Sequence, residues 1–590
     1  MKKIILQVLG LSLSTLLSFS NPSQADELVE SEIYQPAPYA SSANQAQLKL
    51  TSLNPAQRGL SALLFPAQSM HLGKPSSTEL SGLTQQDTRY RALKIGIERT
   101  VPALPTLKDW VWQPVLGGQA AQFIISSEAA ANLRALIQLE QALPTGVELR
   151  VFAPMHADEI YGVYQVSDFK ALEGSKQLEL WTPTLTGSQV GLEVFAPDGV
   201  DVGQIQLSVP QISHIDYDFQ TSQFKLADES VLKFSSCDVS MACASSTWQP
   251  TAQAVARYIF TNSTGSSFLC TGTLLVDKDT GTQIPYFITA AHCINDAVLA
   301  ASMDFYWFHQ ETSCGSGNAS WARTTGGADL LAYRTELDSS LVRLRSSPPI
   351  GVMLSGWTLN SLAMSAPVVG IHHGLGYPKQ FSQGNFVSYA NMSSTTSGFI
   401  VTKDPAGSFT QVAWTQGITA QGSSGSGLWT TINGVPYLKG TLVGGASSCA
   451  TPNAPDEYTR LERFHPYVTT WLEATGGTVT SLVNPNQPLT ALVDGIIMAR
   501  YLAGKHGVEL TNNLTTATIN FAQLETKLDL MKPTLDLDGD GLLEANKDGV
   551  LMIRYLAGLT EAALIGEFDF THSKRKTATE IKQYIETILF

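Results

Sequence analysis

The chain has 590 residues, of which 43% are hydrophobic, 9% aromatic and 15% charged, and its formal net charge is −14. The length is too great for a single core, and the apolar content is too high for a disordered protein. Because no local basic patch offsets the negative charge, we expect no nucleic-acid partner. The low charged fraction and the 47 glycines favour a β-rich, turn-rich protein.

Residues 1–25 have the pattern of a cleaved signal peptide. Lys2 and Lys3 precede an apolar run to about Phe19, and Ser23-Gln24-Ala25 offers small residues where a signal peptidase cuts. An uncleaved membrane anchor is the alternative, but the run is short for a span. We therefore expect a secreted, extracellular protein with no transmembrane span in the mature chain.

The next two stretches differ in pattern. Residues 26–98 scatter Pro, Ser, Ala and Gln without periodicity, which predicts a poorly ordered lead. Residues 99–234 contain short alternating runs between turn signals, which predict an antiparallel β-sandwich. Four of these runs are residues 147–152, 177–181, 190–195 and 204–209.

All six cysteines lie in the middle of the chain, at Cys237, Cys243, Cys270, Cys293, Cys314 and Cys449. An even number of cysteines in a secreted chain predicts disulfides, and six of them allow fifteen pairings. The clustering of the cysteines predicts one disulfide-linked domain over residues 235–475.

Residues 476–488 read as a linker, and residues 489–590 contain an internal repeat. The segment from Ala491 to Gly504 recurs from Ala545 to Gly558, and each copy is an apolar helix that ends at a glycine. Two such units can bury their apolar faces against each other.

Three motifs in this disulfide-linked domain contain the candidate catalytic residues. They are a histidine at the end of an apolar strand (His292), a carboxylate that opens an alternating strand (Asp338), and a serine between glycines (Ser424). A serine hydroxyl needs a base, and a protonated histidine base is stabilised by a carboxylate. Ser426 is a competing nucleophile, but only Ser424 has glycine two residues before it and one after it.

The order of these motifs resembles that of the chymotrypsin-like serine peptidases, and most closely the bacterial lysyl endopeptidases. The resemblance spans about residues 237–471 and includes Thr271 to Leu274, Gly356-Trp357, Ile371 to Gly374 and Gly444 to Cys449. It implies a double β-barrel. The predicted β-sandwich before it resembles the pro-region of such peptidases, and the repeat after it is a small α-helical module, so we expect a mainly β protein.

The resemblance also implies residue roles. His292, Asp338 and Ser424 would form the catalytic triad, and the backbone N–H groups of Gly422 and Ser424 the oxyanion hole. No cofactor is expected for this catalysis. The disulfides implied by the family are Cys270 to Cys293, Cys243 to Cys314, and Cys237 to Cys449.

Asp456 matches the acid with which lysyl endopeptidases receive the substrate ammonium, beside Gly444 and Gly445. A carboxylate at the base of a pocket favours Lys or Arg, and a compact ammonium suits a shallow pocket. The alternative is that Asp456 is a surface loop acid. The chain departs from the family at Val443 and Tyr389, where a histidine and a tryptophan are expected.

We therefore predict a secreted serine endopeptidase that cuts protein or peptide substrates after Lys. Arg or broader tryptic specificity is the alternative within the enzyme class, and an inactive protease-like adhesin is the alternative outside it. Lys233, just before the first cysteine, predicts a self-cleavage site that releases a pro-domain. A permanent substrate-binding or surface-binding sandwich is the alternative.

The second repeat opens with a loop that resembles a dockerin or EF-hand Ca²⁺ loop, with glycine at its sixth position. The expected ligands are Asp536, Asp538, Asp540, Leu542, Glu544 and Asp548. Lys547 stands at the twelfth position, so the closing acid comes one residue late. The first copy has Asn484 and Asn486 instead of acids. We expect one structural Ca²⁺ in a module for folding or attachment, whose partner is unknown.

Overall fold

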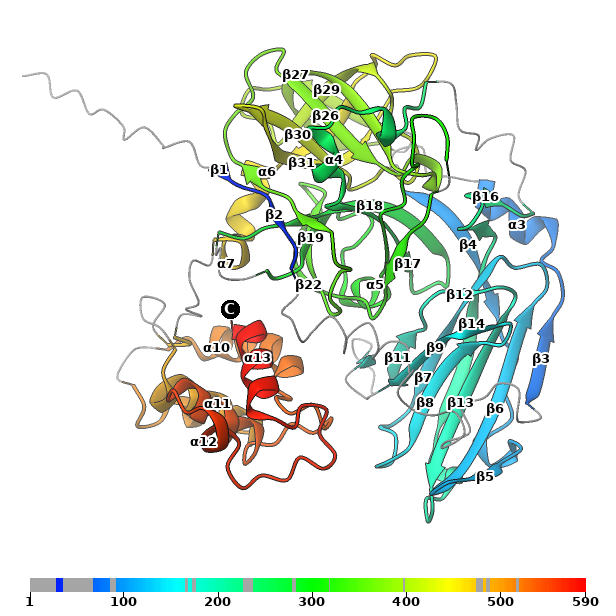
Figure 1. Ribbon diagram of the computed structural model, residues 1–590, viewed down its shortest axis with the longest axis vertical. Helices are drawn as coiled ribbons and strands as arrows, with labels where there is room; N and C mark the ends of the chain where they lie inside the picture. Colours follow the sequence, from blue (N-terminus) through cyan, green and yellow to red (C-terminus); the bar gives the residue numbers. More distant parts are fainter. Residues whose placement is uncertain are drawn as a thin grey trace, which may run out of the picture.

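The computed structural model describes residues 28–35, 67–84, 92–164, 168–171, 177–226, 237–278, 283–317, 319–395, 398–473, 481–483, 489–515 and 519–589. The predicted signal peptide, Lys233, Asn484 and Asn486 lie outside these ranges. The described chain forms an N-terminal β-sandwich, two stacked β-barrels and a C-terminal helical module (Figure 1). No described helix is long and apolar enough to cross a membrane.

The N-terminal part is the predicted β-sandwich. One layer has the order β3–β6–β13–β8–β9, with β5 on the edge of β6. Its strands are Gln68–Leu72, Gly118–Ser127, Gln189–Pro197, Glu148–Ala153, His156–Tyr164 and, for β5, Gln113–Val115. Apolar side chains from this layer, such as Phe123 and Ile125, pack against Leu133 and Ile137 of the facing layer.

The facing layer has the order β10–β11–β7–β14–β4, with β12 on β7, and it continues into the first barrel through the pairing of β4 with β18. These strands are Lys170–Ala171, Leu178–Trp181, Asn132–Leu139, Leu207–Ile215, Leu93–Thr100 and, for β12, Leu185–Thr186. A short hairpin, β15 and β16 (Tyr217–Asp218 and Gln223–Phe224), follows β14. The sandwich and the first barrel therefore share one sheet.

Part of the range expected to be an irregular lead is regular in the structure. It contains β3, β4 and helix α3 (Ser77–Thr84). It also contains β1 (Leu28–Val29) and β2 (Glu32–Ile33), which pair with β25 and β24 of the peptidase-like part. These strands have partners distant in sequence, and a local pattern does not reveal such pairings.

The first barrel follows the order β22–β23–β19–β18–β17–β20–β21. Its strands are Ala328–Arg334, Ser339–Leu344, Tyr286–Thr289, Ser267–Leu275, Val255–Thr261, Asp304–Trp307 and Ala322–Thr324. All seven residues of β17 are buried. Tyr258 and Phe260 face the barrel core, whereas Ile259 packs with side chains of the sandwich. A strand covered on both faces has no polar side, which explains this continuous burial.

The second barrel closes on itself, because β32 pairs with both β29 and β31. Around the ring the order is β31–β30–β26–β27–β29–β32, and short strands β25 and β28 extend it, whereas β24 pairs with β2 in a separate two-stranded sheet. The six ring strands are Val435–Gly445, Gly427–Ile432, Pro367–His372, Gln380–Ser394, Phe409–Gln416 and Asp456–Arg460. Strands β24, β25 and β28 are Met353–Leu354, Trp357–Thr358 and Phe399–Lys403.

Short helices complete this part of the chain: α4 (Trp248–Ala252), α5 (Ala297–Ala301), α6 (Leu461–Phe464) and α7 (Thr469–Leu472). Three disulfides staple it: Cys237–Cys449, Cys243–Cys314 and Cys270–Cys293. These are the pairs that the family resemblance implied, and every described cysteine takes part in one.

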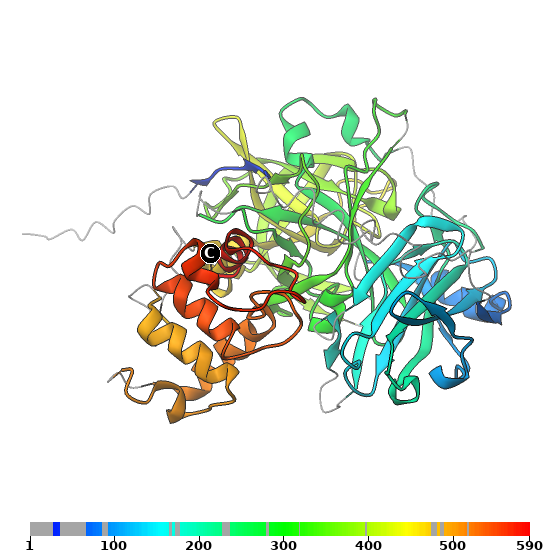
Figure 2. The ribbon, with the colours of Figure 1, turned by 60° about the horizontal axis from the view of Figure 1, so that its bottom comes forward.

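The C-terminal module and the sandwich lie on different sides of the barrels (Figure 2). The helices of the module are α8 (Ile496–Leu502), α9 (Val508–Thr511), α10 (Phe521–Met531), α11 (Asp548–Leu556), α12 (Glu561–Ile565) and α13 (Ala578–Leu589). The two repeat helices, α8 and α11, pack against each other, as the repeat predicted.

Each repeat helix is fixed by an aspartate at matching positions. Asp494 accepts hydrogen bonds from the backbone N–H groups of Leu482 and Thr490, at 2.6 and 2.7 Å. Asp548 accepts them from Leu537 and Glu544, at 2.7 and 2.8 Å. A buried carboxylate needs such donors, so each aspartate ties its helix to the preceding loop.

Candidate active site

His292 and Asp338 come from the first barrel. His292 lies just after β19, whose partners are β18 and β23, and the next residue, Cys293, is bonded to Cys270 of β18. Asp338 directly precedes β23. The pairing of β19 with β23 therefore brings the ends of two strands together, although the residues are 46 positions apart.

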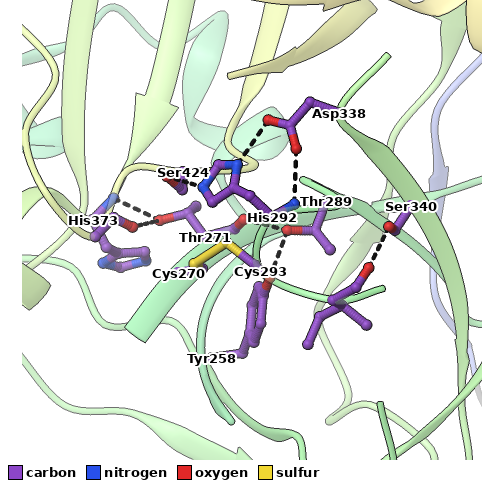
Figure 3. The surroundings of a disulfide bond; sticks show 12 residues. Tyr258, Cys270, Thr271, Thr289, His292, Cys293, Asp338, Ser340, His373 and Ser424 are labelled. Atoms are coloured by element: carbon purple, nitrogen blue, oxygen red, sulfur yellow. Dashed lines mark hydrogen bonds and ion pairs between the residues drawn. A yellow bond between two sulfur atoms is a disulfide. The ribbon is translucent and has the colours of Figure 1, made fainter. Parts of the chain in front are cut away.

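Ser424 comes from the second barrel, in the turn before β30, and meets His292 where the two barrels face each other (Figure 3). The Nε2 atom of His292 lies 2.7 Å from the Ser424 Oγ atom, and its Nδ1 atom lies 2.7 Å from Asp338 Oδ2. The other oxygen of Asp338 accepts a hydrogen bond from the His292 backbone N–H at 2.7 Å. Asp338 thus fixes both the ring and the backbone of His292.

The turn that carries Ser424 requires glycine at position 422. Gly422 has a φ of +93°, and a Cβ atom there would lie 2.7 Å from the His373 carbonyl oxygen. Thr271 holds the same turn, because its hydroxyl donates to the Gly422 carbonyl at 2.7 Å and its N–H to the Ser424 carbonyl at 2.9 Å. The N–H groups of Gly422 and Ser424 donate to no described residue.

Ser426 does not share this arrangement. Its hydroxyl is buried and has no hydrogen-bond partner among the described residues. The Nε2 atom of His292 bonds to Ser424 instead. Of the two serines, only Ser424 therefore has a base within reach.

The two histidines behind the turn have structural contacts. His372 bridges the hydroxyls of Ser423 and Ser382, at 2.9 and 3.0 Å. The Nδ1 atom of His373 lies 3.0 Å from the Tyr377 carbonyl oxygen and acts as the donor. Burial lowers the pKa of His373 well below its ordinary value, and the cations Lys379 and Arg257 lower it further. His373 is therefore a neutral support for the Gly422 turn.

Asp456 is the first residue of β32 and is 0% exposed, so it is not a surface loop acid. Its Oδ2 atom accepts hydrogen bonds from Trp414 Nε1, the Thr419 hydroxyl and the Ser447 hydroxyl, each at 2.7 Å. The Ser447 N–H reaches Oδ1 at 3.1 Å. These neutral donors offset part of the cost of burying a carboxylate but bring no positive charge.

Gly445 lies directly over this carboxylate. It pairs with Asp456 across β31 and β32, and a Cβ atom on Gly445 would lie 2.2 Å from Asp456 Oδ1. Its neighbour Gly444 pairs with Glu457 in the same ladder. A side chain at position 445 would occupy the space next to the acid, which explains why this strand carries glycine.

Val443 and Tyr389 lie in different strands. Val443 is buried in β31, next to Gly444. Tyr389 lies in β27, where its ring stacks on the Arg460 guanidinium at 3.5 Å and its hydroxyl oxygen accepts the Leu362 N–H at 2.7 Å. Tyr389 is therefore fixed in place by these two contacts.

In the acidic loop of the C-terminal module, the side chain of Lys547 is a cation that contacts the acids. Ligand atoms of Asp536, Asp538 and Asp548 lie within 4.8 Å of one another. The Lys547 ammonium bonds to Asp538 and also lies 3.0 Å from Asp540. Burial lowers the pKa of Lys547, but hydrogen bonds to these two carboxylates raise it above its ordinary value overall. The carboxylates suit Ca²⁺ in charge, but Lys547 occupies part of the space that the ion would need.

The remaining expected loop ligands have other contacts. The N–H of Leu542 donates to Asp540 at 2.8 Å, and the N–H of Glu544 donates to Asp548. Burial raises the pKa of Asp548 to about 7, against the opposing effect of its two backbone donors. Asp548 therefore serves first as the anchor of α11.

The fold and the site together define a class. Two β-barrels with a hydrogen-bonded aspartate, histidine and serine at their junction are the arrangement of the chymotrypsin-like serine peptidases.

Comparisons with known proteins agree with this class. Residues 233–459 match the family model of the lysyl endopeptidase C-terminal domain, and residues 71–216 match that of the lysyl endopeptidase N-terminal domain. A lysyl endopeptidase of Pseudomonas aeruginosa is 33% identical over 375 residues, which is 61% of this chain and 76% of that protein. The chain therefore belongs to the lysyl endopeptidase family and is a serine endopeptidase.

Solved protease structures match part of the chain at low similarity. The active form of the Rv3671c protease of M. tuberculosis has 15% identity and a TM-score of 0.26, and the match covers 38% of this chain and 83% of that one. The MamO protease domain of Magnetospirillum magneticum has 10% identity and a TM-score of 0.26, over 37% of this chain and 98% of that one. Because these identities and TM-scores are low, the fold is assigned from the strand pairings described above and not from these structures.

The sequence predicted no role for some residues of the site. Trp414, Thr419 and Ser447 surround Asp456 from three separate segments, and Thr271 fixes the serine turn from the first barrel. Thr271 and Ser447 lie within motifs of the family resemblance, Thr271 to Leu274 and Gly444 to Cys449, but those motifs do not show their partners. Trp414 and Thr419 lie outside every motif, because their proximity to Asp456 depends on how β29, β31 and β32 pair.

Replacing Gly422 with alanine tests the geometry of the serine turn. The new Cβ would force the turn away from His373, so we expect kcat to fall about 100-fold or more, as when an oxyanion donor is lost. Steady-state kinetics on a chromogenic substrate, with fold checked by circular dichroism, measure this. Gly434→Ala is the control, because Gly434 has a φ of +84° but open space around it. Equal kinetics for both variants would contradict the assignment.

Proposed function

We propose that this serine endopeptidase cuts peptide bonds on the carboxyl side of Lys, with His292, Asp338 and Ser424 as its catalytic triad. The observation that carries the proposal is a pair of buried acids with different partners. Asp338 is bonded to His292, and Asp456 pairs with Gly445 and accepts a hydrogen bond from Thr419, which shortly precedes Ser424 in the chain. The first acid suits catalysis, and the second suits recognition of a cation.

The hydrogen bonds support a stepwise acyl transfer. Ser424 Oγ attacks the substrate carbonyl carbon while its proton passes to His292 Nε2, 2.7 Å away. The imidazolium that forms is stabilised by Asp338, which accepts the hydrogen bond from Nδ1. When the carbon–nitrogen bond breaks, Nε2 returns the proton to the leaving amine. Water then attacks the acyl-enzyme by the same route, and no cofactor is needed.

The N–H groups of Gly422 and Ser424 would bind the oxyanion of each tetrahedral intermediate. Both are directed by the turn that Thr271 and His373 constrain. Because the donors are fixed before the reaction, they stabilise developing charge without reorganisation, and each is worth about 3 to 4 kcal/mol.

The environment of Asp456 supports a preference for a basic side chain. Four hydrogen bonds from neutral groups hold the carboxylate in place. Opposite charges attract strongly at a buried site, so a carboxylate there favours a substrate ammonium over an apolar side chain. A compact ammonium requires less space than a guanidinium, which favours Lys over Arg.

Secretion is the second part of the proposal. Three disulfides suit an oxidising compartment, and they agree with the signal-peptide pattern of residues 1–25. We infer that the mature enzyme acts on extracellular proteins.

Asp456→Asn tests the specificity. The amide keeps the size of the side chain but removes its charge, so we expect kcat/KM for Lys substrates to fall at least 100-fold, about 2.7 kcal/mol. Digestion of a mixed peptide library, with product termini identified by mass spectrometry, measures the loss of Lys-terminal products.

Glu457→Gln is the matched control, because Glu457 is the next residue of β32 and its carboxylate bonds to Gln411 instead. It should leave the termini unchanged. Arg-terminal products from the unmodified enzyme, or unchanged specificity in Asp456→Asn, would contradict the proposal.

We further propose that the enzyme matures by cutting its own chain after Lys233, with the N-terminal sandwich as the pro-domain. The purified Ser424→Ala chain should then stay uncut and should not react with a fluorophosphonate probe. N-terminal sequencing and gel labelling measure the two effects. Maturation of purified Ser424→Ala to the same N-terminus would exclude self-cleavage.

For the acidic loop, we propose that Ca²⁺ binds through Asp536, Asp538 and Asp540 only by displacing Lys547. Lys547→Gln removes the competing charge, so we expect Ca²⁺ affinity to rise at least tenfold in calorimetric titration of the full chain. Lys505→Gln, in the first repeat, is the control. An equally weak or absent heat in Lys547→Gln would refute the Ca²⁺ site.

A further inference from the structure

The pairing of β4 with β18 brings the N-terminal domain to the edge of the active site. The partners are Gly96 with Ser267, Lys94 with Phe268, and Leu93 with Leu269. The register of β4 with β14 begins only at Gly96, on the other edge of β4. The first residues of β4, Leu93 and Lys94, therefore have β18 as their ladder partner.

This part of β18 is directly connected to the reacting groups. Thr271, two residues after Leu269, holds the Ser424 turn through two hydrogen bonds. Cys270 is bonded to Cys293, the residue after His292. The Cδ2 atom of Leu269 lies 3.2 Å from the position that a Cβ on Gly422 would take. Leu269 therefore borders the oxyanion turn.

The proton path shows which half of the substrate would meet this edge. His292 gives its proton to the leaving amine, so the chain that follows the cut bond begins next to His292. Cys293, the next residue, is bonded to Cys270, which adjoins Leu269 at the edge of β18, so this edge is the one that the following chain would meet. A strand edge binds an extended peptide through its backbone N–H and C=O groups.

We propose that β4 occupies the edge of β18 that would bind the leaving-group half of a protein substrate, that is, the residues after the cut bond. The N-terminal domain would then block only this half of the site. The proposal rests on the proposed roles of His292 and Ser424. It adds that the domain discriminates between substrates by their length after the cut bond.

The domain is held there by a core-like contact. One apolar cluster spans the contact between the N-terminal domain and the barrel. The barrel contributes Ile259, Leu269 and Tyr306, and the N-terminal domain contributes Leu93, Ile95, Ile97, Ile215, Tyr217, Phe219 and Phe224. Buried polar bonds cross the same contact. Arg134 donates to the Thr261 hydroxyl at 3.0 Å, and the Thr184 N–H donates to Asp304 at 2.8 Å. Cutting the connecting chain would not by itself free β18.

The acyl half of the site, which would bind the substrate residues before the cut bond, remains formed while β4 is in place. The hydrogen bonds of His292 to Asp338 and Ser424 are complete in this structure of the whole chain. A small substrate that needs only the acyl half should therefore react in the uncut chain.

The test uses the full chain kept uncut by Lys225→Gln and Lys233→Gln, with its integrity checked on a gel. It is compared with processed enzyme purified away from the N-terminal fragment, both titrated with a fluorophosphonate. We expect a Lys thioester with a small leaving group to react within about threefold in the two forms. A peptide with four residues after Lys should be cut at least 100-fold more slowly by the uncut form.

Two proline variants of the uncut chain localise the effect. Lys94→Pro disturbs β4 where it pairs with β18 and should raise the peptide rate at least tenfold, with the thioester rate unchanged. Thr100→Pro is the matched control, because Thr100 pairs with Gln211 of β14. It should leave both rates unchanged. Fluorophosphonate titration confirms that each variant retains a formed site.

The outcomes separate the two proposals. Equal peptide rates in the uncut and processed forms, or peptide and thioester rates that fall by the same factor, would overturn the role of β4. If both forms react with the fluorophosphonate but neither hydrolyses the Lys thioester, the proposed Lys preference fails. The same comparison with Arg substrates would then still test β4.

Discussion

Strand β18 connects the separate parts of this molecule. Its start pairs with β4 of the N-terminal domain, its centre carries Cys270 and Thr271, and its end lies in the core of the first barrel. The disulfide of Cys270 fixes the loop of His292, and Thr271 fixes the turn of Ser424. One strand thus sets the distance between His292 and Ser424, the proposed base and nucleophile, which come from different barrels. A small displacement of such groups has a large kinetic cost.

Two buried carboxylates illustrate how the same group takes different roles. Asp338 bonds to His292, and under the proposed function the imidazolium that forms there would compensate its charge. Asp456 accepts hydrogen bonds from the neutral groups of Trp414, Thr419 and Ser447, and under the proposed function it would attract the substrate ammonium. Burial makes both charges costly when unpaired. In the proposed function, that cost would stabilise the imidazolium at Asp338 and select a basic substrate side chain at Asp456.

The C-terminal module applies the same electrostatic rule without an external ligand. Asp538 and Asp540 share the Lys547 ammonium, and Asp494 and Asp548 bind backbone N–H groups at matching places in the two repeats. The repeat therefore conserves its helix anchor between copies, while only the second copy has the acidic loop. An internal ammonium compensates the acids of that loop, and any metal must compete with it.

The sequence by itself determined the mainly β fold, the strands around residues 148–153 and 189–197, and the helical repeat, because alternation, turn residues and internal similarity are local patterns. Its ordered motifs also indicated a serine endopeptidase. The tertiary structure decided that β4 joins the first barrel, that β1 and β2 pair near residue 355, and that Trp414, Thr419 and Ser447 converge on Asp456. It also placed Lys547 among the acids. Each of these contacts joins segments through strand pairing or side-chain packing, which no single segment encodes.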